Sequence, residues 1–291
     1  MKISIITATY NSADTVRDTF DSVLRQTYQD YELVVVDGAS TDETVEIIKE
    51  CEKRFRSISD ERLAMSDERP TPSFRWISER DKGLYDAMNK GIAMATGDVV
   101  GILNSDDFYT SQDILASVAD AFTENAGIDA VYGDIHYVRP EDLACTVRYY
   151  SSRLFRRGWM RFGFMPAHPS FYCRKSIYDR FAKVKTIKRL DDLAINDYPQ
   201  YFDTSYKVAA DFENLLRMIF VGRIKTHYIP MDFVTMRAGG VSNRCMESHR
   251  QINRDHLRAL RENGVFSNIF FLSLRYIYKI GEIVVAKINI D

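Results

Sequence analysis

The chain has 291 residues, of which 45% are hydrophobic and 27% are charged, and its net charge at neutral pH is −2. A chain of this size and composition is typical of a globular protein with a large core, and the slightly acidic balance argues against nucleic acid as the main partner. Its four cysteines are far apart and indicate neither a zinc site nor a disulfide framework, which favours reduced thiols in a cytoplasmic protein. We find no signal peptide and no uncharged apolar stretch of about 20 residues that could span a membrane.

Apolar runs of strand type alternate with patterns of helical spacing along the first half of the sequence. The expected strands cover residues 3–6, 33–36, 76–78, 99–103 and 130–135. Several of these runs are rich in β-branched residues, which is typical of strands buried in a parallel sheet. A β-α-β-α order of this kind predicts a parallel sheet with right-handed crossovers.

Capping residues and composition place the helices and loops between these strands. Asn11 or Ser12 is expected to cap the first helix, and Ser40 with Glu43 predicts a capping box for the second. The polar stretch of residues 57–74 contains two prolines and is expected to be a surface loop or insertion.

Carboxylates follow three of these strands at the point where each strand ends. Asp37, Asp81 and Asp107, with Asp106 beside it, hold these places, and Asp211 opens a later amphipathic helix. Taken alone, an aspartate at a strand end is usually a turn or cap residue. Because parallel strands present their carboxyl ends at one edge of a sheet, we expect the three positions to converge where such sheets bind ligands. Two adjacent carboxylates repel each other, so the pair also indicates a divalent cation that carries a phosphate-rich ligand.

Four sequence blocks lie at these strand ends, namely ITATYN at 6–11, VDGASTD at 36–42, DKGLYDAMNKG at 81–91 and LNSDD at 103–107. In order and spacing they resemble the family 2 glycosyltransferases of the GT-A fold. The resemblance covers roughly the first 110 residues and continues more thinly to residue 242. It implies an α/β fold, a GT-A (Rossmann-like) and mostly parallel sheet flanked by helices, with a helical C-terminal extension.

The resemblance implies roles for individual residues. The residues expected to bind the nucleotide are Ala8, Tyr10, Asp37, Asp81, Lys82, Gly83, Asn104 and Asp106. In the family, the aspartate at the position of Asp37 accepts a hydrogen bond from the base, usually uracil, and Asp107 matches the ligand of Mn²⁺ or Mg²⁺. The order Asn-Ser-Asp-Asp leaves open whether Asp106 also touches the metal. Lys82 is either a diphosphate contact or a solvated lysine.

Asp211 matches the general base of the family, with a plain helix cap as the alternative. A helix N-terminus favours the ionised form that a base needs. On the acceptor side we expect His168, Trp159 and Ser242. His168 is either a buried structural histidine or a contact to the acceptor or diphosphate, and Ser242 lies in a stretch that is either a plain loop or a loop that closes over the site.

Arginines alternate with aromatic residues from position 148 to 164. Three interpretations stay open for this stretch: a mobile loop, a platform on which Trp159 stacks an acceptor sugar, or a contact with a membrane surface. The apolar tail, residues 265–290, either packs on the domain, forms a homodimer or lies on a membrane.

The resulting hypothesis is an inverting, metal-dependent glycosyltransferase. It would move a hexosyl or N-acetylhexosaminyl group from a nucleoside diphosphate sugar, with UDP as the nucleotide, to a hydroxyl of a glycan or lipid-linked glycan in cell-surface polysaccharide synthesis. The alternative is a non-catalytic protein of the same fold that binds nucleotide sugars or serves as a scaffold. A nucleotidyltransferase would need a Gly-rich, basic loop after the first strand, and residues 7–11 contain neither.

The expected domain organisation follows from these matches. Residues 1–225 would form the catalytic domain, with the nucleotide-sugar half at about 1–110 and the acceptor half at about 111–225. Residues 226–291 would form a C-terminal loop and an apolar, amphipathic helical tail. We expect a cytoplasmic protein, with peripheral attachment to the inner face of the membrane as the alternative.

Overall fold

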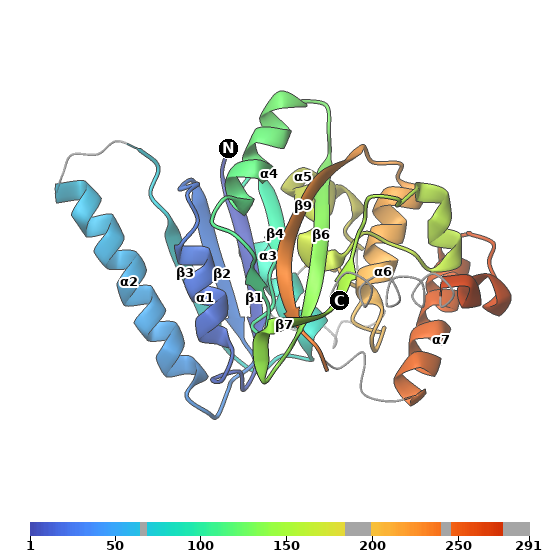
Figure 1. Ribbon diagram of the computed structural model, residues 1–291, viewed down its shortest axis with the longest axis horizontal. Helices are drawn as coiled ribbons and strands as arrows, with labels where there is room; N and C mark the ends of the chain where they lie inside the picture. The colour runs from blue at the N-terminus through green and yellow to red at the C-terminus, as the bar shows by residue number, and fades with distance from the viewer. Residues whose placement is uncertain (65–68, 184–198, 240–245, 276–291) are drawn as a thin grey trace, which may run out of the picture.

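The computed structural model describes residues 1–64, 69–183, 199–239 and 246–275, which form a sheet with helices on both of its faces (Figure 1). The expectation for Ser242 and those for the tail beyond residue 275 lie outside the described residues. Within the described ranges, no helix has the length and apolar composition that crossing a membrane requires.

One mixed sheet of nine strands runs through the described part of the chain. Its strands are β1 (Ile3–Thr9), β2 (Tyr31–Asp37), β3 (Ser73–Ser78), β4 (Val99–Ile102), β5 (Phe108–Tyr109), β6 (Ala130–Arg139), β7 (Asp142–Tyr150), β8 (Tyr172–Arg174) and β9 (Thr226–Arg237). They lie in the order β3-β2-β1-β4-β8-β6-β9-β5, and β7 pairs with β6 outside this path. The first four strands in this order are parallel, as predicted, so their carboxyl ends meet at one edge. Strand β8 is antiparallel to both of its neighbours.

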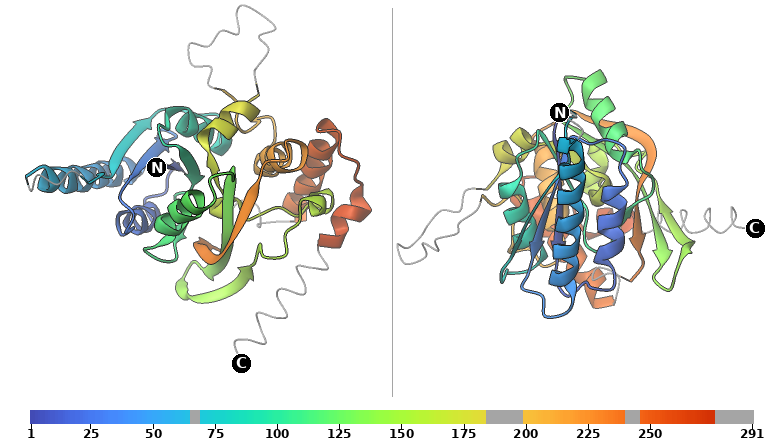
Figure 2. Two further views of the ribbon diagram at one scale, coloured as in Figure 1. Left: turned by 90° about the horizontal axis from the view of Figure 1, so that it is seen from above. Right: turned by 90° about the vertical axis from the view of Figure 1, so that its left-hand side faces the viewer.

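Helices cover both faces of the sheet (Figure 2). They are α1 (Val16–Leu24), α2 (Thr44–Ala64), α3 (Leu84–Met94), α4 (Ile114–Glu124), α5 (Lys175–Phe181), α6 (Ala210–Leu215) and α7 (Met246–Glu262), with 3₁₀ turns η1 (Arg157–Phe162) and η2 (His168–Ser170) and a π-helical turn η4 (Leu216–Val221). Successive strand residues point to opposite faces. Ile5 of β1 therefore belongs to a core cluster with residues of α1, α2 and α4, whereas Ile6 belongs to a second cluster with residues of α3, α6 and α7.

Strand β9 corrects the expectation that residues after 225 form a C-terminal loop. It pairs in parallel with β6 and antiparallel with β5, so residues 226–237 belong to the sheet. This strand is hard to predict from the sequence because it contains Pro230, and proline cannot donate a ladder hydrogen bond. The structure accommodates it where the register with β6 shifts, between the pairs Tyr132–Tyr228 and Asp134–Asp232.

The expectations for helix α2 and the loop after it also need correction. The helix begins at Thr44, whose N–H donates to the Asp42 carboxylate at 3.0 Å, while the Ser40 hydroxyl donates to Asp37 instead. The predicted Ser40–Glu43 capping box is therefore wrong. The helix continues to Ala64, so the first part of the expected loop is helical, because a polar composition also suits a solvent-facing helix.

Helix α1 begins without the cap that was predicted for it. Its N-cap position is Thr15, and no side chain makes a capping hydrogen bond there. Neither Asn11 nor Ser12 caps the helix, because both side chains are used elsewhere in the loop that follows β1.

Candidate active site

The loops after β1 and β2 are joined by hydrogen bonds. The Asn11 N–H donates to the Ser40 hydroxyl oxygen at 2.8 Å, and the Asn11 amide oxygen accepts the Thr41 N–H at 2.9 Å. Asn11 and Ala39 both have left-handed backbones, with φ of 48° and 62°, which allows the chain to turn sharply after each strand. The ring of Tyr10 is left 61% exposed at this edge.

Asp37 is completely buried at the end of β2, yet its carboxylate has an acceptor position to spare. It accepts the Ser40 N–H at 3.0 Å, the Ser40 hydroxyl at 2.5 Å and the Ser78 hydroxyl at 2.6 Å. A carboxylate offers about four lone-pair sites. One more donor, such as the N–H of a base, can therefore bind without displacing these partners.

Asp81 lies against the end of β2. A Cβ atom added to Gly38 would lie 2.8 Å from the Asp81 carboxylate, so a larger residue at position 38 would require the Asp81 side chain to shift. The carboxylate accepts the N–H of Gly83, which has a φ of 110°, at 2.8 Å. Burial raises the pKa of Asp81, and this hydrogen bond opposes the rise. The side chain of Lys82 in the same turn is exposed.

Asp107 is buried at the turn after β4 without a partner for its charge. The turn is anchored to the first loop by a 2.9 Å hydrogen bond between Ser105 and Ser12, and Thr19 donates to the Asp107 carbonyl at 2.7 Å. The Asp107 residue is 1% exposed, and neither carboxylate oxygen makes a well-formed hydrogen bond with a described residue. Burial raises the pKa of Asp107 well above its usual range, and the Asp106 carboxylate beside it raises it further.

This arrangement fits a bound divalent cation. Buried carboxylates are normally paired or coordinated, because an unpaired buried charge is costly. Asp107 and Asp106 would supply two oxygen ligands of the kind that Mn²⁺ and Mg²⁺ accept. Within the described ranges no group of three or more His, Cys, Asp or Glu side chains could hold a metal.

Arg237 is a site residue that the sequence analysis missed. It is the last residue of β9, and its guanidinium donates to the Asp106 carbonyl at 2.6 Å and pairs with Asp18. It also lies over the Phe108 ring, 5.3 Å from the centroid. Its charge lowers the pKa of both Asp106 and Asp107, against the effect of burial. Arg237 reaches this turn only because β9 joins the sheet. Since β9 was not predicted, no local sequence motif indicated this role for Arg237.

Asp211 lies in the first turn of α6, and burial raises its pKa to about 6. The Phe212 N–H, which donates to the carboxylate at 2.8 Å, and the nearby Tyr85 hydroxyl oppose this rise. Burial therefore has a larger effect on this carboxyl than its place at a helix start, which favours the ionised form. Tyr85, whose hydroxyl donates to the Val208 carbonyl, is the second residue of α3. It places Asp211 beside the turn that contains Asp81.

The residues expected on the acceptor side lie in aromatic packing. His168 is 7% exposed, and its ring meets Phe202 edge-on at 5.5 Å. Burial lowers its pKa to about 4, so the ring is neutral at pH 7. The Trp159 ring lies 5.6 Å from Phe164. Phe202 also stacks on the Tyr85 ring, 5.9 Å between centroids, so one aromatic ring separates His168 from the tyrosine beside Asp211.

Comparison with known proteins agrees with this architecture. Residues 4–181 match the family described as glycosyl transferase family 2. A PGL/p-HBAD biosynthesis glycosyltransferase from Mycobacterium bovis is 40% identical over 132 residues, which are 45% of this chain and 46% of that protein. An uncharacterized glycosyltransferase from Nostoc is 34% identical over 109 residues, 38% of this chain and 29% of that one. The chain thus spans about half the length of the mycobacterial relative and less than a third of the length of the Nostoc relative.

Solved structures share the fold at low sequence identity. TarS from S. aureus, residues 1–349, superposes with a TM-score of 0.57 at 18% identity, over 89% of this chain and 65% of that one. A mannosyltransferase from Pyrobaculum calidifontis, in complex with GDP-Man and Mn²⁺, gives a TM-score of 0.55 at 15% identity, over 95% and 79% of the two chains. These likenesses establish a GT-A-type fold.

Proposed function

The chain belongs to glycosyl transferase family 2, and we propose on that basis that it transfers a sugar from a nucleoside diphosphate sugar to a hydroxyl of a glycan or lipid-linked glycan. The proposed nucleotide is UDP, the transferred group is a hexosyl or N-acetylhexosaminyl unit, and the product serves cell-surface polysaccharide synthesis. One observation carries the proposal: Asp107 is a buried carboxylate with two unpaired oxygens, at the sheet edge that also holds Asp37 and Asp81.

The donor half, about residues 1–110, would bind the nucleotide at this edge. Ala8 and the exposed ring of Tyr10 would pack against the nucleoside, and the spare acceptor position of Asp37 would receive an N–H of the base. The exposed Lys82 is free to reach the diphosphate. The acceptor half, about residues 111–225, would supply Asp211 as the general base for the acceptor hydroxyl.

Asp107, with Asp106 beside it, would hold the divalent cation. When bound, Mn²⁺ or Mg²⁺ neutralises charge on the departing diphosphate. Arg237 fixes the backbone of this turn through the Asp106 carbonyl, so both carboxylates keep a constant position as the donor arrives.

Asp211 would act as the general base. Its carboxylate takes the proton of the acceptor hydroxyl while the hydroxyl oxygen attacks the anomeric carbon from the face opposite the diphosphate. The new carbon–oxygen bond forms as the bond to the diphosphate oxygen breaks, and the anomeric centre inverts. A pKa of about 6 leaves the carboxylate ionised at pH 7 but more basic than an ordinary aspartate. Such base catalysis contributes about 10²–10⁴ in rate.

A thermal-shift panel with UDP, GDP, TDP and CMP, each with and without Mn²⁺, tests the donor site. Binding to the folded state raises the melting temperature by mass action, corresponding to about 2.7 kcal/mol at 100 times the Kd. We expect a shift with UDP that requires Mn²⁺ and is absent in Asp107→Ala. Asp211→Ala is the matched control, because it should lose sugar transfer while keeping the UDP shift.

Two outcomes would count against the proposal. Equal UDP affinity of the wild type and Asp107→Ala in Mn²⁺ would remove the metal assignment. No shift with any nucleotide, together with no transfer from UDP-sugars, would favour the non-catalytic alternative.

A further inference from the structure

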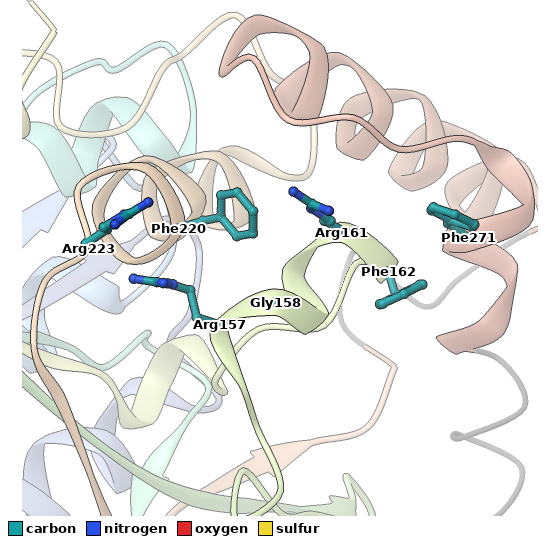
Figure 3. A pocket seen from close by; sticks show the side chains of 7 residues that line it. All are labelled: Arg157, Gly158, Arg161, Phe162, Phe220, Arg223 and Phe271. Carbon is teal, nitrogen blue, oxygen red and sulfur yellow. The ribbon is translucent and has the colours of Figure 1, made fainter.

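A pocket lined by arginines and phenylalanines lies away from the candidate carboxylates. Its volume is about 570 Å³, and its walls are formed by Arg157, Gly158, Arg161, Phe162, Phe220, Arg223 and Phe271. These residues come from η1, from η4 and the turn after it, and from a helical segment at residues 269–275. Figure 3 shows the three guanidinium groups arranged around the ring of Phe220. We call Arg157, Arg161 and Arg223 the arginine cluster.

The arginine cluster carries positive charge that the described part of the chain does not neutralise. All three residues are exposed, and none of them forms an ion pair with a described carboxylate. Arg161 lies 5.5 Å from the centroid of Phe220, and this cation–π contact leaves its charge in place. Three arginines around one pocket in a chain of net charge −2 therefore form a local anion-binding surface.

Apolar side chains project into solvent beside this cluster. Phe266 and Phe270 are 72% and 67% exposed, the highest values among large apolar residues in the described ranges. Both contact Phe271 in the pocket wall, with ring centroids 6.2 and 6.4 Å apart. The ring centroid of Phe271 in turn lies 5.3 Å from that of Phe162 of η1, and Figure 3 shows the two side chains next to each other. The exposed rings and the arginine cluster thus form one continuous surface.

The fold holds this surface in a fixed arrangement. The Ser267 hydroxyl donates to the Arg161 carbonyl at 2.6 Å, which joins the C-terminal segment to η1. A Cβ atom on Gly163 would lie 2.9 Å from the Arg275 guanidinium and 3.1 Å from Leu272, so the two segments pack closely. The segment that carries the exposed phenylalanines is therefore packed against η1 and Gly163.

We propose that this surface docks the protein on an anionic lipid bilayer. Guanidinium groups bind lipid phosphates in a bidentate manner, and protruding phenylalanines partition into the boundary between headgroups and acyl chains. A folded protein partner would need a matching pocket for each projecting ring, whereas a fluid bilayer accepts them without one. Charge and apolar surface act together here, as stable interfacial binding requires.

The surface lies near enough to Asp211 for docking to position the candidate general base relative to the bilayer. Helix α6 and η4 are continuous, with Asp211 in the first turn and Phe220 near the far end. At about 1.5 Å of rise per residue, roughly 14 Å of helix separates them. A docked molecule would hold its candidate base within reach of groups that extend from the bilayer surface.

Vesicle co-sedimentation of the full chain tests the proposal without donor, metal or acceptor. The vesicles contain phosphatidylcholine alone or mixed with phosphatidylglycerol. We expect binding to the anionic vesicles, weakened by added salt because exposed charges are screened. Replacing the three arginines of the cluster with glutamine should lower the partition coefficient on the order of 100-fold, at about fivefold for each charge. Phe266→Ser with Phe270→Ser should also lower it.

Arg25→Gln is the matched control, since Arg25 is an exposed arginine that directly follows α1, and α1 and α7 lie toward opposite ends of the molecule in Figure 1. It should change binding less than about twofold, a small fraction of the loss expected for the cluster. Each variant should retain the Mn²⁺-dependent UDP shift of the wild type, which separates loss of docking from loss of folding and from failure of the proposed transfer. The Arg161→Gln single variant and the salt series keep the test valid if the triple variant does not fold.

Three results would overturn the proposal. The first is equal partition of the wild type and the triple variant. The second is equal binding to neutral and anionic vesicles. The third is a dimer in sedimentation velocity that Phe266→Ser with Phe270→Ser dissociates while vesicle binding stays absent, which would assign the surface to a second copy of the chain.

Discussion

Replacing Asp211 with asparagine should abolish sugar transfer and, at the same time, stabilise the protein. The ordinary pKa of 3.8 rises to about 6 in the folded state, a difference worth at most about 3 kcal/mol of unfolding free energy at about 1.4 kcal/mol per pH unit. The folded state holds this proton more tightly than the unfolded state, so stability falls as pH rises from about 4 to 6 and the cost is fully present at pH 7. Asparagine keeps the shape of the side chain and removes that cost.

Urea denaturation at several pH values measures this effect. At pH 7.5 we expect Asp211→Asn to be more stable than the wild type by about 1–3 kcal/mol, equivalent to a few degrees in Tm. The gain should shrink steadily as the pH is lowered through 6 toward 4. Transfer activity of the wild type should fall over the same range, because only the ionised carboxylate accepts a proton.

Asp203→Asn is the matched control with the opposite sign. Burial alone would raise the pKa of Asp203, but hydrogen bonds from Lys183 and Ser205 outweigh it and lower the pKa to about 2. Its ionised form therefore stabilises the fold, and the variant should be less stable than the wild type at pH 7.5. A stability gain for Asp211→Asn that does not depend on pH, or a loss at pH 7.5, would refute the reasoning.

Three further variants test the surroundings of the site. Asp107→Asn should raise the Tm of the metal-free protein, because it removes a buried unpaired charge, and should abolish the Mn²⁺-dependent UDP shift; a lower Tm would contradict this. Arg237→Gln should lower the free energy of unfolding in urea by about 1–3 kcal/mol and weaken Mn²⁺-dependent UDP binding, and Arg237→Lys should restore part of both. Unchanged UDP binding in Arg237→Gln would rule out a positioning role for Arg237. Glu213→Gln should cost about 3 kcal/mol in urea unfolding, since Glu213 is completely buried and pairs with Lys183 at 3.1 Å and Arg217 at 3.2 Å; an effect below about 1 kcal/mol would show that these pairs contribute little.

The sheet and its carboxylates could be predicted because short stretches of sequence are enough to identify them. Runs of β-branched residues identify β1, β2 and β4, and each run stops at the polar residues that define the edge. The parallel pairing then follows from the crossovers, so the convergence of Asp37, Asp81 and Asp107 needs no tertiary information. The family match over residues 4–181 and the fold of the solved structures agree with the predicted family and sheet architecture.

The features that were missed depend on distant partners. Arg237 meets Asp106 across 131 residues of sequence, and only after β9 has paired with β6. The pKa of Asp211 depends on how deeply α6 packs, whereas the sequence shows only its helix-start position. The arginine cluster and the phenylalanines beside it come from three separate segments, so the alternation of arginine and aromatic residues at 148–164 indicated a surface but did not identify Phe266 and Phe270 as part of it.

The position of Arg237 also constrains when the site can form during synthesis. All the candidate donor carboxylates have been translated by residue 107, but the arginine that holds their turn follows 130 residues later. It pairs with Asp18 of α1 across 219 residues, so one side chain joins the first helix to β9, the last strand in chain order within the described ranges. Such long-range closure is a late event in folding. A nascent or truncated chain that ends before β9 would contain the turn with Asp106 and Asp107 but would lack Arg237. Donor binding would therefore indicate that the whole sheet has formed.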